Sequence, residues 1–318
     1  MRCRVDRWNP DRKIIAEAAL ALRRGRLVAF PTETVYGLGA DGLDADAVRA
    51  IYRAKGRPSD NPLILHLAAP GEAGGVALVD ERARRLMELF WPGPLTLVLP
   101  ARCDVVPSVT RGGLDTVALR MPSHPVALAL IEAADRPVAA PSANRSGRPS
   151  PTEAQAVDED LGESLAFLLD GGPTDMGVES TVVDATGPSL LLLRPGALAL
   201  EKIEEAAGLV ERPRAGEGRR SPGTRYRHYA PDLPLLLWGE AGLPEIDGSV
   251  GYMGLDEAPF PVARSVRFRS VEDYARGLFS ALRHLERSGV DVLVAQWPPS
   301  QGLGLAVRDR LLRASGRE

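Results

Sequence analysis

Lys55 and Arg57, two basic residues separated by a single glycine, are the first sign of chemistry in this sequence. Lysine supplies a compact charge and arginine a planar fork for two oxygen atoms, so the pair suits a polyphosphate. Cations also gather at helix C-termini without any ligand, and this pair follows a predicted helix. Because Lys55 is one of only three lysines among 39 basic residues, the functional interpretation is favoured.

Further polar segments follow predicted strands along the chain. They are residues 31–39 (PTETVYGLG), Arg120, residues 141–147 (PSANRSG) and Arg194. Loops at strand ends commonly build ligand sites in α/β proteins, so these segments are expected to converge on one cleft. Each also has a simpler interpretation, as a polar turn, a capping residue or an arginine in solvent.

The apolar periodicity disappears between residues 211 and 232, which predicts a linker between two domains. Residues 221–231 (SPGTRYRHYAP) nevertheless combine two arginines and His228 with Tyr226 and Tyr229. This composition predicts a lid that covers an anionic ligand. The alternative is a contact with single-stranded RNA, since basic and aromatic residues also suit a nucleic-acid backbone and its bases.

The elements that must position these residues alternate between helix and strand. Strands are predicted at 26–30, 62–67, 95–99, 116–119, 137–140, 165–169, 180–184 and 190–193, with helices at 11–24, 80–90 and 125–134 and another that Asp44 caps. Several connections are too short for a helical crossover, which predicts a mixed sheet. The domains are expected at 1–210 and 233–318, joined by the linker 211–232. The second is a small α/β domain with strands at 235–238, 249–253 and 290–295 and helices at 271–287 and 303–314.

Composition argues against two classes of protein. The net charge of -3 shows no basic excess, so no strong nucleic-acid binding is expected. No apolar run approaches the roughly 20 residues that cross a bilayer, and the first nine residues lack the apolar core of a signal peptide. Cys3 and Cys103 lie far apart without metal-ligand spacing, which fits a reducing compartment. The sequence therefore predicts a cytoplasmic protein with no membrane contact.

The ordered motifs PTETVYGLGA, KGRPSDNPLILHL, DTVALRMPSHP, PSANRSGRPSP, ESTVVD, LLRPG and SPGTRYRHYAP closely resemble the YrdC-like family of threonylcarbamoyl-AMP synthases. The resemblance covers nearly the whole of residues 12–231. The linker and the part beyond it, chiefly GLGLAVRDRLLRA, point to the two-domain branch. The implied fold is a YrdC-like twisted mixed-sheet domain followed by a small Rossmann-like α/β domain.

The resemblance implies a nucleotidyltransferase that makes L-threonylcarbamoyl-AMP and pyrophosphate from L-threonine, bicarbonate and ATP, for the threonylcarbamoyladenosine modification of tRNA. Mg²⁺ would enter with ATP and not through a metal site of the protein. The implied partners are threonylcarbamoyl transferase proteins that act next on tRNA. The alternative function is a non-catalytic RNA-binding module of the same fold.

The resemblance also assigns residues to each substrate. A lone histidine in an apolar strand is more often a core residue, so the role of His66 depends on this family pattern. The implied L-threonine site consists of Thr34, His66, Arg120, Ala140 and Ser180. The implied ATP site consists of Lys55, Arg57, Asn61, Thr116, Ser142, Asn144, Ser150, Arg194 and His228, with Lys55 and Arg57 also catalytic and Tyr226 and Tyr229 in the lid.

Overall fold

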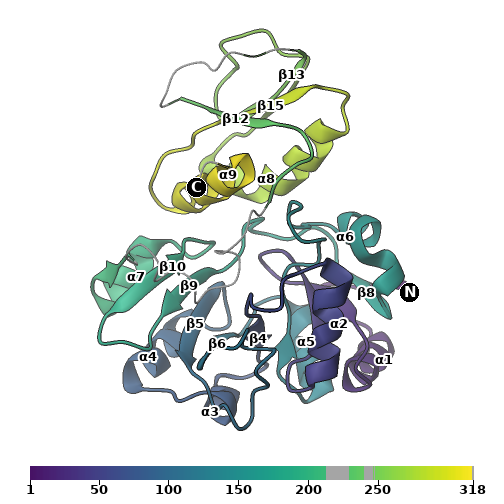
Figure 1. Cartoon of the computed structure of the whole chain (residues 1–318), viewed down its shortest axis with the longest axis vertical. Helices are drawn as coiled ribbons and strands as arrows, with labels where there is room; N and C mark the ends of the chain where they lie inside the picture. The colour runs from purple at the N-terminus through teal and green to yellow at the C-terminus, as the bar shows by residue number, and fades with distance from the viewer. Residues whose placement is uncertain (213–228, 240–245, 247, 317–318) are drawn as a thin grey trace.

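Two α/β domains follow each other along the long axis of the molecule (Figure 1). The computed structural model describes residues 1–212, 229–239, 246 and 248–316. The first sheet has its last described strand at Val210–Glu211, and the second sheet begins at Leu235–Trp238. The linker predicted at 211–232 thus lies mostly outside the described residues.

A mixed sheet forms the first domain, as predicted. In the described part of the chain it has 11 strands in the order β1-β8-β2-β3-β7-β4-β6-β5-β9-β10-β11. The strands are β1 Arg2–Arg4, β2 Val28–Pro31, β3 Tyr36–Asp41, β4 Ile64–His66, β5 Leu95–Pro100, β6 Thr116–Arg120, β7 Val138–Ala139, β8 Phe167–Asp170, β9 Thr181–Asp184, β10 Leu190–Arg194 and β11 Val210–Glu211. β4 and β6 pair in parallel, whereas β5 and β6 pair antiparallel.

Helices cover this sheet and bury their apolar faces against it. They are α1 Arg12–Arg23, α2 Ala45–Lys55, α3 Ala73–Val76, α4 Glu81–Phe90, α5 Pro125–Ala134, α6 Ala154–Leu161 and α7 Leu200–Ala207. In α1, Ala18 and Leu22 lie one helical turn apart and are buried in one cluster with residues of α5, β2 and β8. The Asp11 side chain caps α1 and the Asp44 side chain caps α2, as expected of acidic N-caps.

One segment differs from the sequence-based expectation. Residues 31–39 were expected to form a loop after a strand, but the second half of the segment begins β3, which pairs antiparallel with β2. Its glycines permit this close packing, because a Cβ atom on Gly39 would lie 2.8 Å from Cε1 of Phe30. Only residues 32–35 remain as a tight turn at the end of the sheet.

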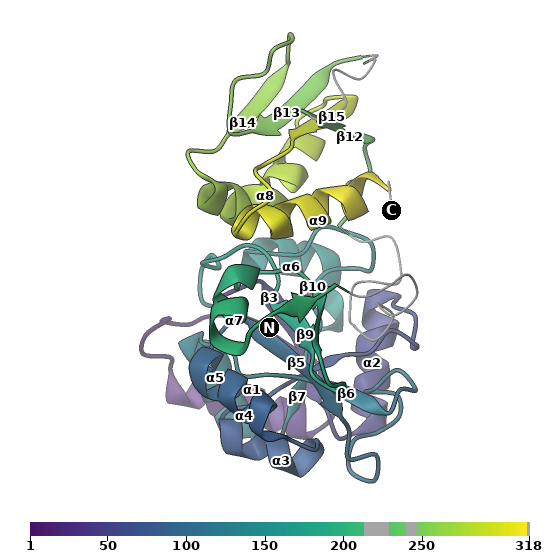
Figure 2. The same ribbon diagram turned by 90° about the vertical axis from the view of Figure 1, so that its left-hand side faces the viewer.

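The C-terminal domain contains a parallel sheet with the order β12-β15-β13-β14. Its strands are β12 Leu235–Trp238, β13 Val250–Gly254, β14 Arg264–Arg267 and β15 Val292–Gln296, and its helices are α8 Val271–Glu286 and α9 Leu303–Ser315. Both helices lie on the side of this sheet that faces the first domain (Figures 1 and 2). The parallel sheet confirms the predicted Rossmann-like architecture. Within the described ranges, no helix is long and apolar enough to cross a membrane.

Candidate active site

The parallel pairing of β4 with β6 brings two predicted ligand residues together. In this register His66 lies opposite Arg120, each at the C-terminal end of its strand. Ala140 follows β7 directly, and its backbone nitrogen donates to the carbonyl oxygen of Ile64 in β4. Since the side chains of paired residues project to the same face of a sheet, three of the five predicted L-threonine residues meet at one place.

A cavity of about 60 Å³ opens at this place, and we call it the central cavity. Its lining residues come from both halves of the first domain and from the linker. They are Thr34, Val35, Arg57, Leu63, Ile64, His66, Arg120, Ala140, Pro141, Ser142, Glu179, Ser180, Arg194 and Tyr229. All five predicted L-threonine residues and three of the predicted ATP residues therefore line one cavity.

Arg120 is held rigidly on one side of the central cavity. Its Nη2 donates to Oε1 of Glu33 at 2.6 Å, its Nη1 donates to Oγ1 of Thr34 at 3.1 Å, and its Nε donates to the carbonyl oxygen of Gly93 at 3.3 Å. Arginine carries five N–H donors, so this arrangement leaves two for a ligand carboxylate. Glu33 is thereby identified as the group that orients Arg120, a role that sequence reasoning missed although Glu33 stands beside Thr34.

His66 beside Arg120 is uncharged. Burial, together with the nearby positive charge of Arg120, lowers the pKa of His66 to about 3. Its Nδ1 atom is buried and has no hydrogen-bond partner among the described residues. A buried polar atom without a partner is costly, which is consistent with a ligand group that completes it.

Ser180 and Arg194 form another part of the lining of the central cavity. Nη2 of Arg194 donates to the carbonyl oxygen of Ser180 at 3.0 Å and to its Oγ at 3.1 Å. Thr96, a buried residue of β5, also shares a hydrogen bond of 2.8 Å with Oγ of Ser180. Gly196 permits this approach, because a Cβ atom there would lie 2.3 Å from the carbonyl carbon of Ser180. No sequence signal singled out Thr96.

Buried positive charge makes the central cavity attractive to anions. Burial and the neighbouring Arg194 lower the pKa of Arg57 to about 10. Burial likewise lowers the pKa of Arg194. The guanidinium of Arg57 donates hydrogen bonds to two neutral groups, the carbonyl oxygens of Asn61 and Pro62. An anion bound between these two arginines would relieve the cost of burying their charges.

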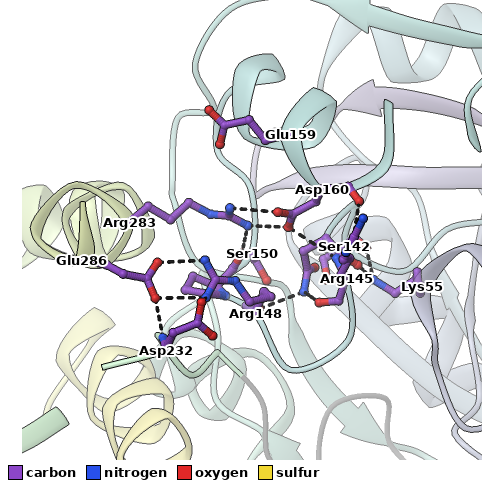
Figure 3. Close-up of polar contacts among 12 residues, drawn as sticks. Lys55, Ser142, Arg145, Arg148, Ser150, Glu159, Asp160, Asp232, Arg283 and Glu286 are labelled. Carbon is purple, nitrogen blue, oxygen red and sulfur yellow. Dashed lines mark hydrogen bonds and ion pairs between the residues drawn. The ribbon is translucent and has the colours of Figure 1, made fainter. Parts of the chain in front are cut away.

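Lys55 is buried and does not line the central cavity. Its Nζ donates to the carbonyl oxygens of Ser142 and Asn144, which fixes the loop 141–147 against the end of α2 (Figure 3). Burial, with a contribution from Arg57, lowers the pKa of Lys55 well below its usual value. The structure thus gives Lys55 a role in holding this loop, and its direct contact with ATP stays a prediction.

The remaining predicted ATP residues occupy different positions. Both polar atoms of the buried Asn61 side chain, and Oδ1 of Asn144, have no partner in the described part of the chain. Ser150 is buried and donates to Oε1 of Glu179 at 2.6 Å. Thr116 begins β6 and is half-buried, four residues before Arg120 and outside the lining of the central cavity. Asn61 and Asn144 therefore retain unused hydrogen-bonding capacity, whereas Ser150 reaches the cavity through Glu179.

The predicted lid is described only at its end. Tyr229 is buried with φ of 66°, lines the central cavity and stacks on Phe279 of α8 with ring centroids 5.3 Å apart. Left-handed backbone is unusual for a tyrosine, so the surroundings hold it there. Tyr226 and His228 lie outside the described residues, so their predicted roles stay predictions.

Family models match both domains of the chain, and known proteins match nearly its whole length. A family model for Sua5, YciO and YrdC proteins, described as "Telomere recombination", matches residues 20–196, and a "Threonylcarbamoyl-AMP synthase, C-terminal domain" model matches residues 198–316. Threonylcarbamoyl-AMP synthase of Pyrococcus abyssi is 47% identical over 99% of this chain and 96% of that protein. Its Bacillus subtilis namesake is 44% identical over 98% of this chain and 96% of its own length.

Solved structures of related proteins have a similar fold. The crystal structure of Pyrococcus abyssi Sua5 complexed with L-threonine matches with a TM-score of 0.92 at 44% identity, and the match covers 99% of this chain and 98% of that one. Escherichia coli YciO matches 62% of this chain and 95% of its own, with a TM-score of 0.57 at 26% identity. The names of the relatives favour the enzyme over the RNA-binding alternative. Matched along nearly its whole length and in both domains, the chain belongs to the threonylcarbamoyl-AMP synthase family.

Proposed function

We propose that this chain joins ATP, L-threonine and bicarbonate into L-threonylcarbamoyl-AMP and pyrophosphate at the central cavity. The observation that carries the proposal is the convergence of three buried arginines, Arg57, Arg120 and Arg194, on one cavity that also contains hydroxyl groups. Arg120 would bind the threonine carboxylate, and Arg57 and Arg194 would bind phosphate oxygens. The name of the relatives and the L-threonine in the Pyrococcus abyssi structure support the proposed activity and its amino-acid substrate.

The proposed reaction has two steps. The amino nitrogen of threonine attacks CO2 derived from bicarbonate and loses a proton, which gives a carbamate. A carbamate oxygen then attacks the α-phosphorus of ATP, and the bond from that phosphorus to the bridging oxygen breaks to release pyrophosphate. Because the carbamate supplies its own attacking oxygen, the protein has to position the reactants and to stabilise developing charge.

The buried arginines suit this task. Charge that develops on the departing pyrophosphate is stabilised most effectively by donors that are already in place and shielded from water. The Ser180 hydroxyl, held by Thr96 and Arg194, and the Thr34 hydroxyl, held by Arg120, would contact the threonine. Tyr229 would exclude water from the carbamate.

We also propose Mg²⁺ as the metal that accompanies ATP, with phosphate oxygens and water among its ligands. Bound there, the metal would neutralise charge on the departing pyrophosphate. Among the residues that the structure describes, no group of three or more His, Cys, Asp or Glu side chains is placed to hold a metal.

We further propose that the enzyme acts in the cytoplasm and passes its product to threonylcarbamoyl transferase proteins that modify tRNA. Cys3 and Cys103 are free thiols, which is compatible with a reducing compartment.

The test is release of pyrophosphate from ATP by the full chain in bicarbonate buffer with and without L-threonine, together with mass spectrometry of the product. We expect release to depend on both threonine and bicarbonate, with serine as a poorer substrate. Release that needs neither would point to simple ATP hydrolysis and reject the proposal.

A further inference from the structure

Arg310 of α9 is fully buried where the C-terminal domain meets the first domain. Its side chain is 0% exposed, and Nε donates to Oε2 of Glu179 at 2.7 Å. Nη1 donates to the carbonyl oxygen of Pro195 at 3.0 Å and to Oδ2 of Asp309, on its own helix, at 2.6 Å. Nη2 is buried without a hydrogen-bond partner in the described ranges. Arg310 therefore reaches the first domain at two points, one just before β9 and one just after β10.

Both points adjoin residues of the central cavity. Glu179 directly precedes Ser180, and Pro195 directly follows Arg194. The guanidinium of Arg310 also lies 5.3 Å from the ring centroid of Tyr229, a cation–π contact with another lining residue of the cavity. The C-terminal domain thus contacts two lining residues of the central cavity, Glu179 and Tyr229, through the single side chain of Arg310.

Glu179 needs this partner for electrostatic reasons. It lines the central cavity together with Arg57 and Arg194. Burial acts to raise the pKa of Glu179, but Arg310, Arg194 and the Ser150 hydroxyl outweigh it and hold the pKa below its usual value. A buried carboxylate without a neighbouring cation would attract Arg194 and repel the phosphates of ATP.

Other ion pairs between the domains differ from this one. Arg283 of α8 pairs with Asp160 at 2.7 Å, and Arg148 pairs with Glu286 of α8 at 2.8 Å (Figure 3). None of these residues belongs to the lining of the central cavity. Such pairs hold the domains together, whereas the Arg310 partner Glu179 faces the proposed substrates.

We propose that Arg310 is a positioning residue for ATP, which neutralises Glu179 so that Arg194 stays directed at the phosphates, and which supports Tyr229 at the cavity wall. This inference rests on the proposed function. It gives the C-terminal domain a part in substrate binding beyond that of an attached module.

The experiment compares the full chain with Arg310→Met, with Glu179→Gln, and with the double variant. The dissociation constant of ATP is measured by calorimetry, and the KM for ATP and the kcat are measured by threonine-dependent pyrophosphate release. We expect Arg310→Met to weaken ATP binding by about tenfold or more, with a smaller change in kcat. Glu179→Gln in the same chain removes the unpaired charge and should restore binding to within about threefold.

Arg283→Met is the matched control, since it removes another buried arginine that pairs with a carboxylate across the domains. If Arg310 serves only to dock the domains, both arginine variants weaken ATP binding alike and Glu179→Gln rescues neither, which overturns the proposal. If Arg310→Met does not fold, Arg310→Gln takes its place. Unchanged ATP binding in Arg310→Gln would also overturn the proposal. Turnover by the wild-type chain tests the proposed function. The rescue of ATP binding is measured by calorimetry and needs no turnover, so the two proposals can fail separately.

Discussion

Replacing Arg57 by methionine should harm activity without harming stability. Burial lowers the pKa of this guanidinium by about 2.5 from its ordinary value, to about 10. Each pKa unit corresponds to about 1.4 kcal/mol, so the charge costs the folded, ATP-free protein about 3 kcal/mol. Because the pKa is lower in the folded protein than in the unfolded chain, this cost is fully present below pH 10 and disappears as the pH rises towards the ordinary pKa of arginine.

Arg57→Met removes the charge but keeps much of the side-chain volume. It also removes the hydrogen bonds to the carbonyl oxygens of Asn61 and Pro62, at about 1 kcal/mol each. The free energy of unfolding without ATP should therefore stay the same or rise by up to about 2 kcal/mol. In contrast, kcat/KM should fall by about 100-fold, the usual effect of losing a preorganised donor to the transition state.

Urea denaturation at pH 7.5 and threonine-dependent pyrophosphate release measure these two quantities. Arg53→Met, on the exposed face of α2, is the control and should change neither. A loss of more than about 2 kcal/mol with Arg57→Met would mean that the side chain is mainly structural. Normal kcat/KM would show that it does not contact the reacting groups.

Three further outcomes are expected. Glu33→Gln should raise the KM for threonine about tenfold and lower the melting temperature, because Arg120 loses the buried carboxylate that orients it. An unchanged KM would show that Arg120 does not bind threonine. His66 stays unprotonated in the folded protein, whereas the unfolded chain takes up a proton as the pH falls from 6.5 towards 3. In urea titrations, the wild type should therefore lose about 2 kcal/mol more stability than His66→Gln between pH 8 and pH 5. Equal losses would contradict the low pKa of His66. Chelation by EDTA should abolish turnover and added Mg²⁺ should restore it, whereas full turnover in EDTA would exclude a need for the metal.

Elements with a strong local signal were predictable from the sequence. The helix predicted at 125–134 coincides with α5, and the strand predicted at 235–238 coincides with β12, since each has an uninterrupted apolar pattern of the right length. β1 was missed because the sequence Arg2–Arg4 has no strand pattern and forms one only by pairing with β8. α6 and α7, each of eight residues, were also too short to stand out.

The site residues that belong to the family motifs were predictable from the sequence. The contacts between residues far apart in the chain were not. Thr34, His66, Arg120, Ala140 and Ser180 meet at one cavity, as the resemblance implied. The hydrogen bond between Glu179 and Arg310 joins residues 131 positions apart, and no local sequence pattern predicts such a contact. The same holds for the bond of Lys55 to the carbonyl oxygen of Asn144, 89 positions away.

The strand order of the first sheet also determines when the enzyme can assemble. β4 lies between β7 and β6, and β2 lies between β8 and β3, so strands made early in synthesis have neighbours that are made much later. Closing such long loops is entropically unfavourable until several strands pair together, and folds rich in distant contacts form slowly. A nascent chain that has reached only α5 still lacks β7, β8 and β9, and with them the partners that hold three parts of the sheet in place. Assembly of the binding site should therefore be a late, concerted event that depends on most of the first domain having left the ribosome.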